Sequence, residues 1–200
     1  MEVASVKRRY RMGARAEATA ATRRSIAEAF LALFGERHYD EVTLERVAER
    51  AGVSVQTVIR HFGSKDELFV NVAREFGEAE FARRAEAPVG DVAGAIRTVV
   101  DHYERVAEIV LSLLAQEDRL EALREAADMG RRGHYDWVDR VFEPHLAAAS
   151  AGERRRRRGQ LVALTDIYVW KLLRRDLGFG RRQTEAAMTE MVTALLGRGK

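Results

Sequence analysis

The sequence predicts an all-α protein with an N-terminal helical head, a connector helix and a larger C-terminal helical domain. Three observations support this fold class. The 200 residues include only two prolines, Pro88 and Pro144. Alanine, leucine, glutamate and arginine, which favour helices, are plentiful. No alternation of polar and apolar residues persists long enough to indicate a strand, whereas apolar residues recur at helical spacing in several stretches.

Composition excludes several classes of protein. No apolar run approaches the roughly 18 residues that a membrane-spanning helix needs, and the polar N-terminus lacks the apolar core of a secretory signal, so we expect a cytoplasmic protein. Cysteine is absent, which rules out disulfides, thiolate nucleophiles and cysteine-ligated zinc. A formal net charge of +3 is too small to indicate nucleic-acid binding by itself.

The first 21 residues form a basic arm that leads into the first predicted helix. Glu2 and Glu17 are the acids in the arm and the start of that helix. The cations of the same stretch are Lys7, Arg8, Arg9, Arg11, Arg15, Arg23 and Arg24. Such an arm gains affinity for DNA by releasing counterions from phosphates. A solvated terminal tail would have the same composition, and both interpretations stay open.

Residues 22–34 predict a helix that packs over the segment that follows it. Its apolar face consists of Ile26, Phe30, Leu33 and Phe34, which recur at helical spacing. With the next two helices it completes a three-helix head.

Residues 43–62 predict two short helices joined by a tight turn. The Thr43 hydroxyl is placed to cap the first helix, and Gly52 ends it, because glycine adopts the left-handed conformation at low cost. Ser54 then caps the second helix. This spacing is typical of a helix-turn-helix, which inserts its second helix into the major groove of DNA.

The exposed side of this helical pair predicts the DNA contacts. Gln56 and Thr57, near the start of the second helix, are the expected contacts to bases or the adjacent backbone. Lys65 lies at a further capped helix start that suits a phosphate. The candidate DNA-binding residues are Thr43, Ser54, Gln56, Thr57, Arg60, His61 and Lys65. The alternative is an ordinary helical hairpin whose polar residues face solvent.

These residues resemble the TetR family of bacterial one-component repressors. The matching features are the leading helix at 22–34, the linker 39–43, the Gly-Val-Ser turn, Thr57 and the segment 60–69. One position departs from the family pattern, because Ile59 stands where members usually carry a tyrosine that often contacts a phosphate. The resemblance implies a DNA-binding head, a connector helix and a helical domain that binds a small molecule and dimerises.

The clearest break in the chain is the stretch 87–91, where Pro88 and Gly90 interrupt helical periodicity. The predicted organisation is a basic N-terminal arm at 1–21, a helix-turn-helix DNA-binding domain with its connector helix at 22–86, and a ligand-binding and dimerisation domain at 87–200.

Within the C-terminal domain we expect Asp91 to cap a long helix over 92–115. A shorter helix carrying Leu120 and Leu123 should follow, then a break at Met129–Gly130, and then a helix that ends near Pro144.

The last two predicted helices, about 154–175 and 181–197, carry apolar residues on more faces than one core needs. A two-fold pair of such hairpins forms a four-helix bundle, so we expect a homodimer. The expected interface residues are Leu161, Leu164, Tyr168, Leu172, Met188, Met191, Val192 and Leu195. The alternative is that both faces serve the core of a monomer. The basic run 154–158 favours a solvated helix start paired with nearby acids over a second DNA contact.

The resemblance also implies a small-molecule site in the C-terminal domain. The residues that offer apolar walls with a few polar groups are His102, Tyr103, Met129, His134, Trp137, Phe142, Asp166 and Trp170. Each of them can instead be a core residue. A lining of this kind suits a hydrophobic or aromatic effector.

Together these features predict a transcriptional regulator, a repressor that binds a palindromic operator as a dimer and is released by such an effector. No catalytic residue, metal ligand or cofactor is expected, because the five histidines show no metal-binding spacing and phosphate-binding glycine loops are absent. The alternatives are a helical ligand-binding or interaction protein that no longer binds a specific operator and, less favoured, a helical enzyme.

Overall fold

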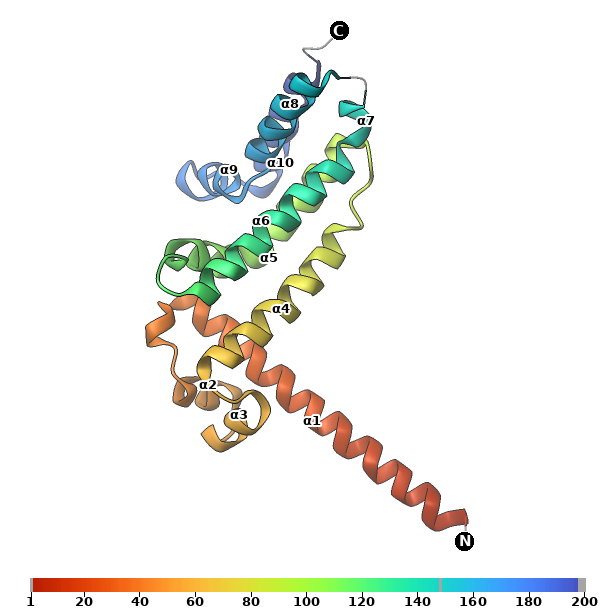
Figure 1. Cartoon of the computed structure of the whole chain (residues 1–200), viewed down its shortest axis with the longest axis vertical. Coiled ribbons are helices and arrows are strands. Elements are labelled where there is room, and N and C mark those ends of the chain that lie inside the picture. Colours follow the sequence, from red (N-terminus) through yellow and green to blue (C-terminus); the bar gives the residue numbers. More distant parts are fainter. Residues whose placement is uncertain (1, 148, 198–200) are drawn as a thin grey trace. The chain divides into compact units, whose positions relative to one another are not determined.

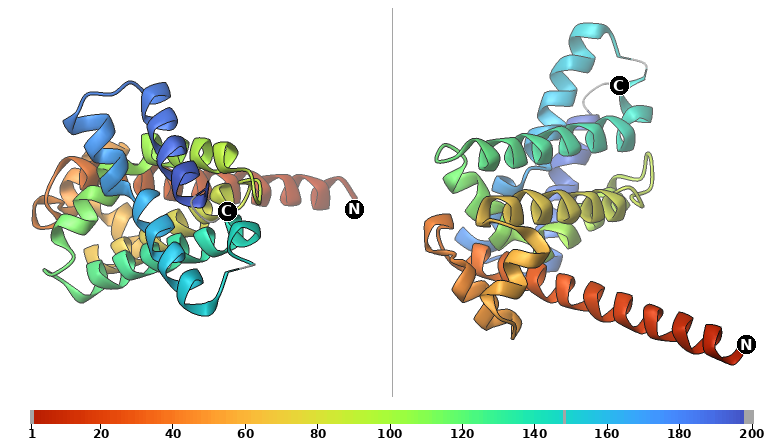
Figure 2. Two further views of the ribbon diagram at one scale, coloured as in Figure 1. Left: turned by 90° about the horizontal axis from the view of Figure 1, so that it is seen from above. Right: turned by 60° about the horizontal axis from the view of Figure 1, so that its bottom comes forward.

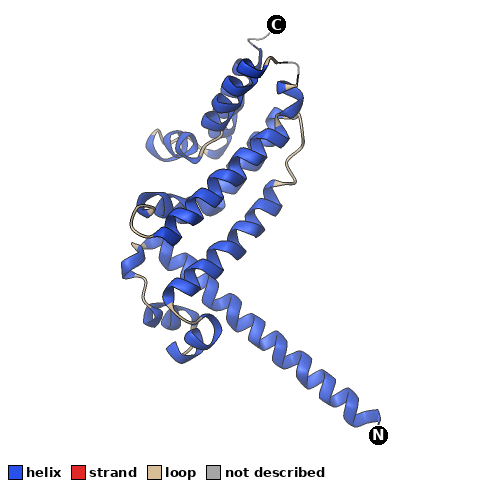
Figure 3. Cartoon of the chain, viewed as in Figure 1, coloured by secondary structure: helices blue, strands red, loops and turns tan. Residues whose placement is uncertain are grey.

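A computed structural model describes residues 2–147 and 149–197, and the side chains of residues 2–15 lie outside that description. All regular elements in the described part are helical (Figure 3), which confirms the predicted fold class. They are α1 (Glu2–Glu36), η1 (Tyr39–Glu41), α2 (Leu44–Ala51), α3 (Val55–Phe62), α4 (Lys65–Arg84), α5 (Val92–Gln116), α6 (Glu121–Val141), α7 (Glu143–Leu146), α8 (Ala151–Leu164), α9 (Ile167–Lys171), the π-helical segment η2 (Leu172–Asp176) and α10 (Arg181–Gly197). Among these helices none is long and apolar enough to cross a membrane.

The chain packs into two compact units. Unit 1 comprises the residues up to 74 together with 108–123, and unit 2 comprises 75–107 together with the residues from 124 onward. Helices α4, α5 and α6 therefore each contribute to both units. These units describe packing alone, and the functional domains expected at 1–21, 22–86 and 87–200 stay predictions.

Unit 1 is built around α1, α2 and α3 (Figure 1). Helix α1 begins at Glu2 and runs without a break through the predicted helix at 22–34, so the helix is longer than its apolar stripe indicated. Residues 16–21 are exposed. The basic side chains at positions 7, 8, 9, 11 and 15 lie outside the described side chains.

The core of unit 1 is an aromatic cluster. Phe30 and Phe34 of α1 stack at 6.2 Å, and the Phe69 ring of α4 lies 5.7 Å from that of Phe34. Tyr39 closes the cluster edge-on, 5.5 Å from Phe69. Its backbone N–H donates to Gln116 Oε1 at 2.7 Å, which fastens the loop after α1 to the end of α5. Burial of such rings provides most of the stability of a small helical head.

In unit 2 the predicted break at Met129–Gly130 is wrong, because α6 runs unbroken from Glu121 to Val141. A glycine in a helix costs only about 1 kcal/mol relative to alanine, and packing outweighs it here. A side chain at Gly133 would collide with the Phe81 ring of α4, and one at Gly77 would lie 2.8 Å from Met129 Cε. These glycines let α4 and α6 approach closely. Other expectations are confirmed, since Asp91 Oδ1 accepts from the Gly94 N–H at 3.0 Å and α6 ends shortly before Pro144.

The single helix expected over about 154–175 is also wrong. Helix α8 ends at Leu164, and Asp166 then caps α9 by accepting from the Tyr168 N–H at 2.9 Å. Asparagine, aspartate, serine and threonine hydrogen-bond the backbone and compete with helix continuation, which explains the break at Thr165 and Asp166. Helix α10 lies beside α8 (Figure 2), and its bounds agree with the expected helix at 181–197.

The basic run 154–158 lies inside α8 and does not start it. Ser150 caps the helix and Glu153 places an acid in its first turn, where the helix dipole favours negative charge. Arg157 pairs with Glu153 at 2.7 Å, and Arg158 pairs with Asp139 of α6 through two hydrogen bonds of 2.6 and 2.8 Å. The expected pairing with acids is thus found for Arg157 and Arg158, whereas the expected helix start is wrong, because α8 begins at Ala151.

Candidate nucleic-acid interface and effector cavity

The turn between α2 and α3 has the geometry that the sequence predicts. The Thr43 hydroxyl accepts from the Arg46 N–H at 3.3 Å, and Gly52 ends α2 in the left-handed conformation with φ of 67°. The Ser54 hydroxyl accepts from the Thr57 N–H at 3.2 Å and bonds the Thr57 hydroxyl at 2.9 Å. Both helices are thus capped, and their crossing is fixed by the buried side chains of Val47, Ala48, Val58 and Phe62.

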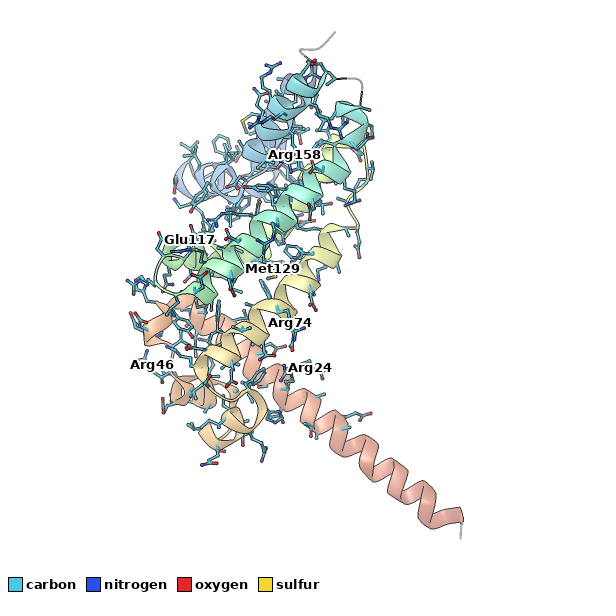
Figure 4. The ribbon with its side chains drawn as sticks, viewed as in Figure 1. Arg24, Arg46, Arg74, Glu117, Met129 and Arg158 are labelled. Carbon is cyan, nitrogen blue, oxygen red and sulfur yellow. The ribbon has the colours of Figure 1, made fainter. Side chains whose placement is uncertain are left out.

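The outer face of α3 is available to a partner. Gln56 and Arg60 are exposed, and Thr57 and His61 are half-buried. Ile59 lies between them with 46% of its surface exposed, at the position where the TetR resemblance implies a tyrosine. An apolar side chain there cannot bond a phosphate. Arg46 on α2 and Arg24 on α1 are also exposed (Figure 4).

Helix α1 holds the C-terminal ends of both short helices. Arg23 Nη1 donates to the His61 carbonyl at 3.2 Å, and its guanidinium lies 4.2 Å from the centre of the Phe62 ring. The Ser25 hydroxyl donates to the Ala51 carbonyl at 3.3 Å. A positive charge at the end of α3 is favourable because the helix dipole is negative there. The sequence groups Arg23 with the basic arm, and its supporting contacts with α3 become visible only in the structure.

Lys65, the expected phosphate ligand, already has a partner within the protein. Its ammonium group donates to the Tyr39 carbonyl at 3.0 Å and lies 4.0 Å from the centre of that ring. The start of α4 is closed as well, since the Glu67 carboxylate accepts from the Ser64 N–H at 2.7 Å. Hydrogen bonds from the Ser64 backbone and hydroxyl lower the pKa of Glu67. Lys65 keeps donors for a phosphate, but a helix start already occupied by an acid offers less to it.

Unit 2 contains a cavity of about 380 Å³ between the end of α4 and the middle of α6. Of the residues expected to bind an effector, Met129 and Trp137 line it, and Figure 4 shows Met129 on α6. The lining residues that sequence analysis missed are Phe81, Arg84, Ala85, Arg132, Gly133, Asp136 and Arg140. A periodic signal was present, because positions 129, 132, 133, 136, 137 and 140 form one stripe of a helix. Its arginines make that stripe resemble a solvated surface.

The remaining effector candidates lie in unit 2 outside the lining of this cavity, and all of them are buried except Asp166, which is half-buried. His102 Nδ1 donates to Glu80 Oε2 at 3.0 Å, and the Tyr103 hydroxyl donates to the Thr165 carbonyl at 2.9 Å. Burial raises the pKa of Tyr103 and lowers that of His102. Burial alone would also raise the pKa of Glu80, but hydrogen bonds from His102 and Arg105 hold it well below its ordinary value.

His134 bonds a buried arginine. Arg84 Nη2 donates to His134 Nδ1 at 2.8 Å, so the imidazole proton resides on Nε2, which lies 3.2 Å from the Val162 carbonyl. Burial and the nearby Arg84 charge lower the pKa of His134 to about 3. This histidine is therefore neutral at physiological pH.

The last three effector candidates are Phe142, Trp170 and Asp166. Phe142 is fully buried and meets the Trp137 ring edge-on at 5.9 Å. Trp170 is also buried, and its Nε1 has no hydrogen-bond partner. Asp166 caps α9, and its burial raises its pKa. Within the described residues no cluster of three or more histidines and acids is placed to hold a metal ion.

The expected interface residues divide into two groups. Leu161, Met188 and Val192 are fully covered by their own chain. Tyr168 and Leu172 are 57% and 50% exposed, whereas Leu164, Met191 and Leu195 are partly exposed. The residues that stay accessible for an interface are therefore those of this second group, together with the exposed Leu177.

Comparison with known proteins supports the helix-turn-helix and the whole fold. Residues 26–72 match the model of the bacterial regulatory proteins of the tetR family. A transcriptional regulator from Rhodococcus sp. Rha1 is 21% identical over 88% of this chain and 96% of its own, with a TM-score of 0.70. A TetR-family regulator from Streptomyces coelicolor is 17% identical over 88% of this chain and 81% of its own, with a TM-score of 0.68. A TetR-family regulator from Mesorhizobium loti is 19% identical over 90% of this chain and 97% of its own, with a TM-score of 0.63. Residues 26–72 therefore match the tetR family, and the chain as a whole shares the fold of these regulators.

Proposed function

We propose that this chain is a one-component transcriptional repressor that acts in the cytoplasm, binds a two-fold symmetric operator as a homodimer and is released by a small hydrophobic or aromatic effector. The observation that carries the proposal is the capped α2–α3 pair, whose outer face presents Gln56 and Arg60 while its inner face is buried. A helix held in this way enters the major groove without further ordering.

The chemistry of that face suits base recognition. An arginine donates two hydrogen bonds to guanine, and a glutamine pairs in the same way with adenine, so Gln56 and Arg60 are the proposed specificity residues. Thr43, Ser54, Thr57, His61 and Lys65 surround them with hydroxyl, imidazole and ammonium groups that suit phosphates. Each operator half-site would meet one copy of α3.

The proposed dimer rests on exposed apolar side chains near the end of unit 2. Tyr168, Leu172 and Leu177 are each half exposed or more, and they lie on or directly after α9 and η2. Contiguous exposed apolar side chains are typical of interaction sites. Leu172→Glu should shift the protein from dimer to monomer in sedimentation equilibrium, whereas Val89→Glu, at an exposed residue in the loop before α5, should not.

The proposed switch uses α4, which begins in unit 1 and ends at the cavity of unit 2. An effector that binds the cavity changes the packing of the end of this helix, and the helix carries the change toward the DNA-binding head. Release requires that the effector binds more tightly to the DNA-incompetent state, because equal affinity for both states shifts no equilibrium.

Selection from a random duplex library tests the DNA-binding function directly. The full chain should retain a two-fold symmetric sequence, with affinity that falls steeply as salt rises. Arg60→Ala and Gln56→Ala should each lose about 1–3 kcal/mol of discrimination at one position of each half-site. Lys65→Ala should weaken all sequences alike. Arg182→Ala, which removes an exposed cation on α10, is the matched control and should change neither property.

Two results would contradict the proposal. If no duplex is retained selectively, the protein is a helical ligand-binding or interaction protein that has lost its operator, an alternative that the exposed Ile59 favours. If the Arg60 and Gln56 variants keep the sequence preference of the parent, the recognition surface lies elsewhere.

A further inference from the structure

Arg84 is an unusual residue in the effector cavity, because its charge is buried without an acid to pair with it. The side chain is on α4 and only 4% of the residue is exposed. Among the described residues no carboxylate lies within ion-pair distance of it, and its Nε is buried without a hydrogen-bond partner. A buried charge with incomplete hydrogen bonding costs several kcal/mol.

The groups that surround Arg84 do not neutralise it. Nη2 donates to neutral His134, and the guanidinium lies 4.6 Å from the centre of the Trp137 ring. Glu80 and Asp166 are near enough to act on its charge, but Glu80 is paired with His102 and Arg105, and Asp166 caps α9. The guanidinium therefore has unused capacity for an anion.

The other charged groups of the cavity add to this positive field. Arg132 and Arg140 of α6 line it together with Arg84, and Asp136 is the single acid of the lining. Arg140 donates to the carbonyls of Ala87 and Arg84 at 3.2 Å, which holds its guanidinium at the wall. Arg132 is exposed. Three cations face one acid, so the cavity favours an anionic group.

The rest of the lining is apolar. Phe81, Met129 and Trp137 form walls on both helices, and the Trp137 indole N–H donates to the Arg84 carbonyl at 3.1 Å. A volume of about 380 Å³ falls in the range of sites that bind small organic molecules. The lining of the cavity therefore combines apolar walls with arginine side chains.

We propose that this cavity binds a carboxylic acid with an apolar chain or ring system, whose carboxylate bonds Arg84 and Arg132 while its body contacts Phe81, Met129 and Trp137. This inference rests on the effector role proposed above and specifies its chemical class. Arginine donates in a planar fork that matches a carboxylate, and the bound anion supplies the partner that Arg84 lacks.

The test compares acids with alcohols of the same shape, in the absence of DNA. The full chain is titrated calorimetrically with decanoate against decanol and with 2-naphthoate against 2-naphthol. At least one acid should bind ten times or more tighter than its alcohol. Arg132→Gln, which changes an exposed side chain and leaves packing intact, should reduce that preference severalfold, and Arg84→Met should abolish it. Arg155→Gln, at an exposed arginine of α8, is the charge-matched control and should have no effect.

Fluorescence locates the bound acid. In a Trp170→Phe variant, Trp137 is the single tryptophan, and its emission should change as the acid binds. Equal affinity for acids and alcohols, an unchanged preference in Arg132→Gln, or an unaltered Trp137 emission would each overturn the inference. Because these measurements use no DNA, they fail or succeed independently of the operator selection. Arg84→Met could misfold, so Arg132→Gln decides the outcome.

Discussion

Replacing Tyr39 by phenylalanine tests how firmly the N-terminal helical head is assembled. The Tyr39 hydroxyl donates to Asp66 Oδ1 at 2.5 Å and so ties the loop after α1 to the first turn of α4. The substitution removes this bond but keeps the ring contacts with Phe34 and Phe69. A hydrogen bond to a charged group contributes about 1.5–3 kcal/mol. Asp66 is exposed and water can replace the lost donor, so we expect the lower value, about 1.5 kcal/mol.

Thermal unfolding followed by circular dichroism measures this loss. For a chain of this size, about 1.5 kcal/mol lowers Tm by roughly 3–6 °C. Amide hydrogen exchange should also quicken in the first turn of α4, which separates a local effect in unit 1 from one in unit 2. The matched control is Tyr135→Phe, at a residue 37% exposed in unit 2, and it should change the stability by less than about 0.5 kcal/mol. If Tyr39→Phe changes stability no more than the control, the hydroxyl contact does not hold the head together.

Three further predictions follow from backbone geometry, titration and charge. Gly52→Ala should destabilise the protein by about 1 kcal/mol, because φ is 67° there. Gly152→Ala, in a helix with open space around it, should stabilise the protein by up to about 1 kcal/mol. Equal changes in the free energy of unfolding for the two variants in chemical denaturation would contradict this. The pKa of His134 is about 3 in the folded state and near 6.5 when unfolded. The stability that the neutral His134 contributes is therefore fully present above pH 6.5 and is lost as pH falls toward 3. The free energy of unfolding should fall by up to about 1.4 kcal/mol per pH unit over this range. Thermal scans of His134→Gln should show a shallower loss between pH 6.5 and 4.5, and an unchanged slope would refute the assignment. Deleting residues 2–15 should flatten the salt dependence of operator binding if the basic arm contacts phosphates, and an unchanged slope would favour the solvated tail.

The helix-turn-helix could be predicted residue by residue because its signals are local. A cap at Thr43 or Ser54 and a left-handed turn at Gly52 depend on neighbours within four positions, and a few residues suffice to specify them. The breaks of the C-terminal half were harder to predict. Gly130 indicated a break in the helix, but close packing of α4 on α6 outweighs it. Asp166 lies in the middle of an apolar stripe, so the sequence did not indicate that it caps a new helix.

The cavity of unit 2 shows the same contrast. Aromatic residues such as Phe142 and Trp170 were plausible walls, but the structure buries them in the core, since sequence does not specify which helix a given face meets. Arg84 was not singled out, because an arginine near a helix end usually faces solvent. Its burial without an acid becomes visible only when α4 and α6 are brought together.

The sequence by itself determined the all-helical class, the capped helix-turn-helix and the match of residues 26–72 to the tetR family, because periodicity, caps and turns are set by interactions between near neighbours in the chain. Only the tertiary structure decided which apolar faces are covered, which leucines of α8 and α10 stay partly exposed, and where a cavity lined by arginines forms. Those features depend on contacts between residues distant in sequence, such as Arg84 with His134 and Gly133 with Phe81, and no local pattern encodes them.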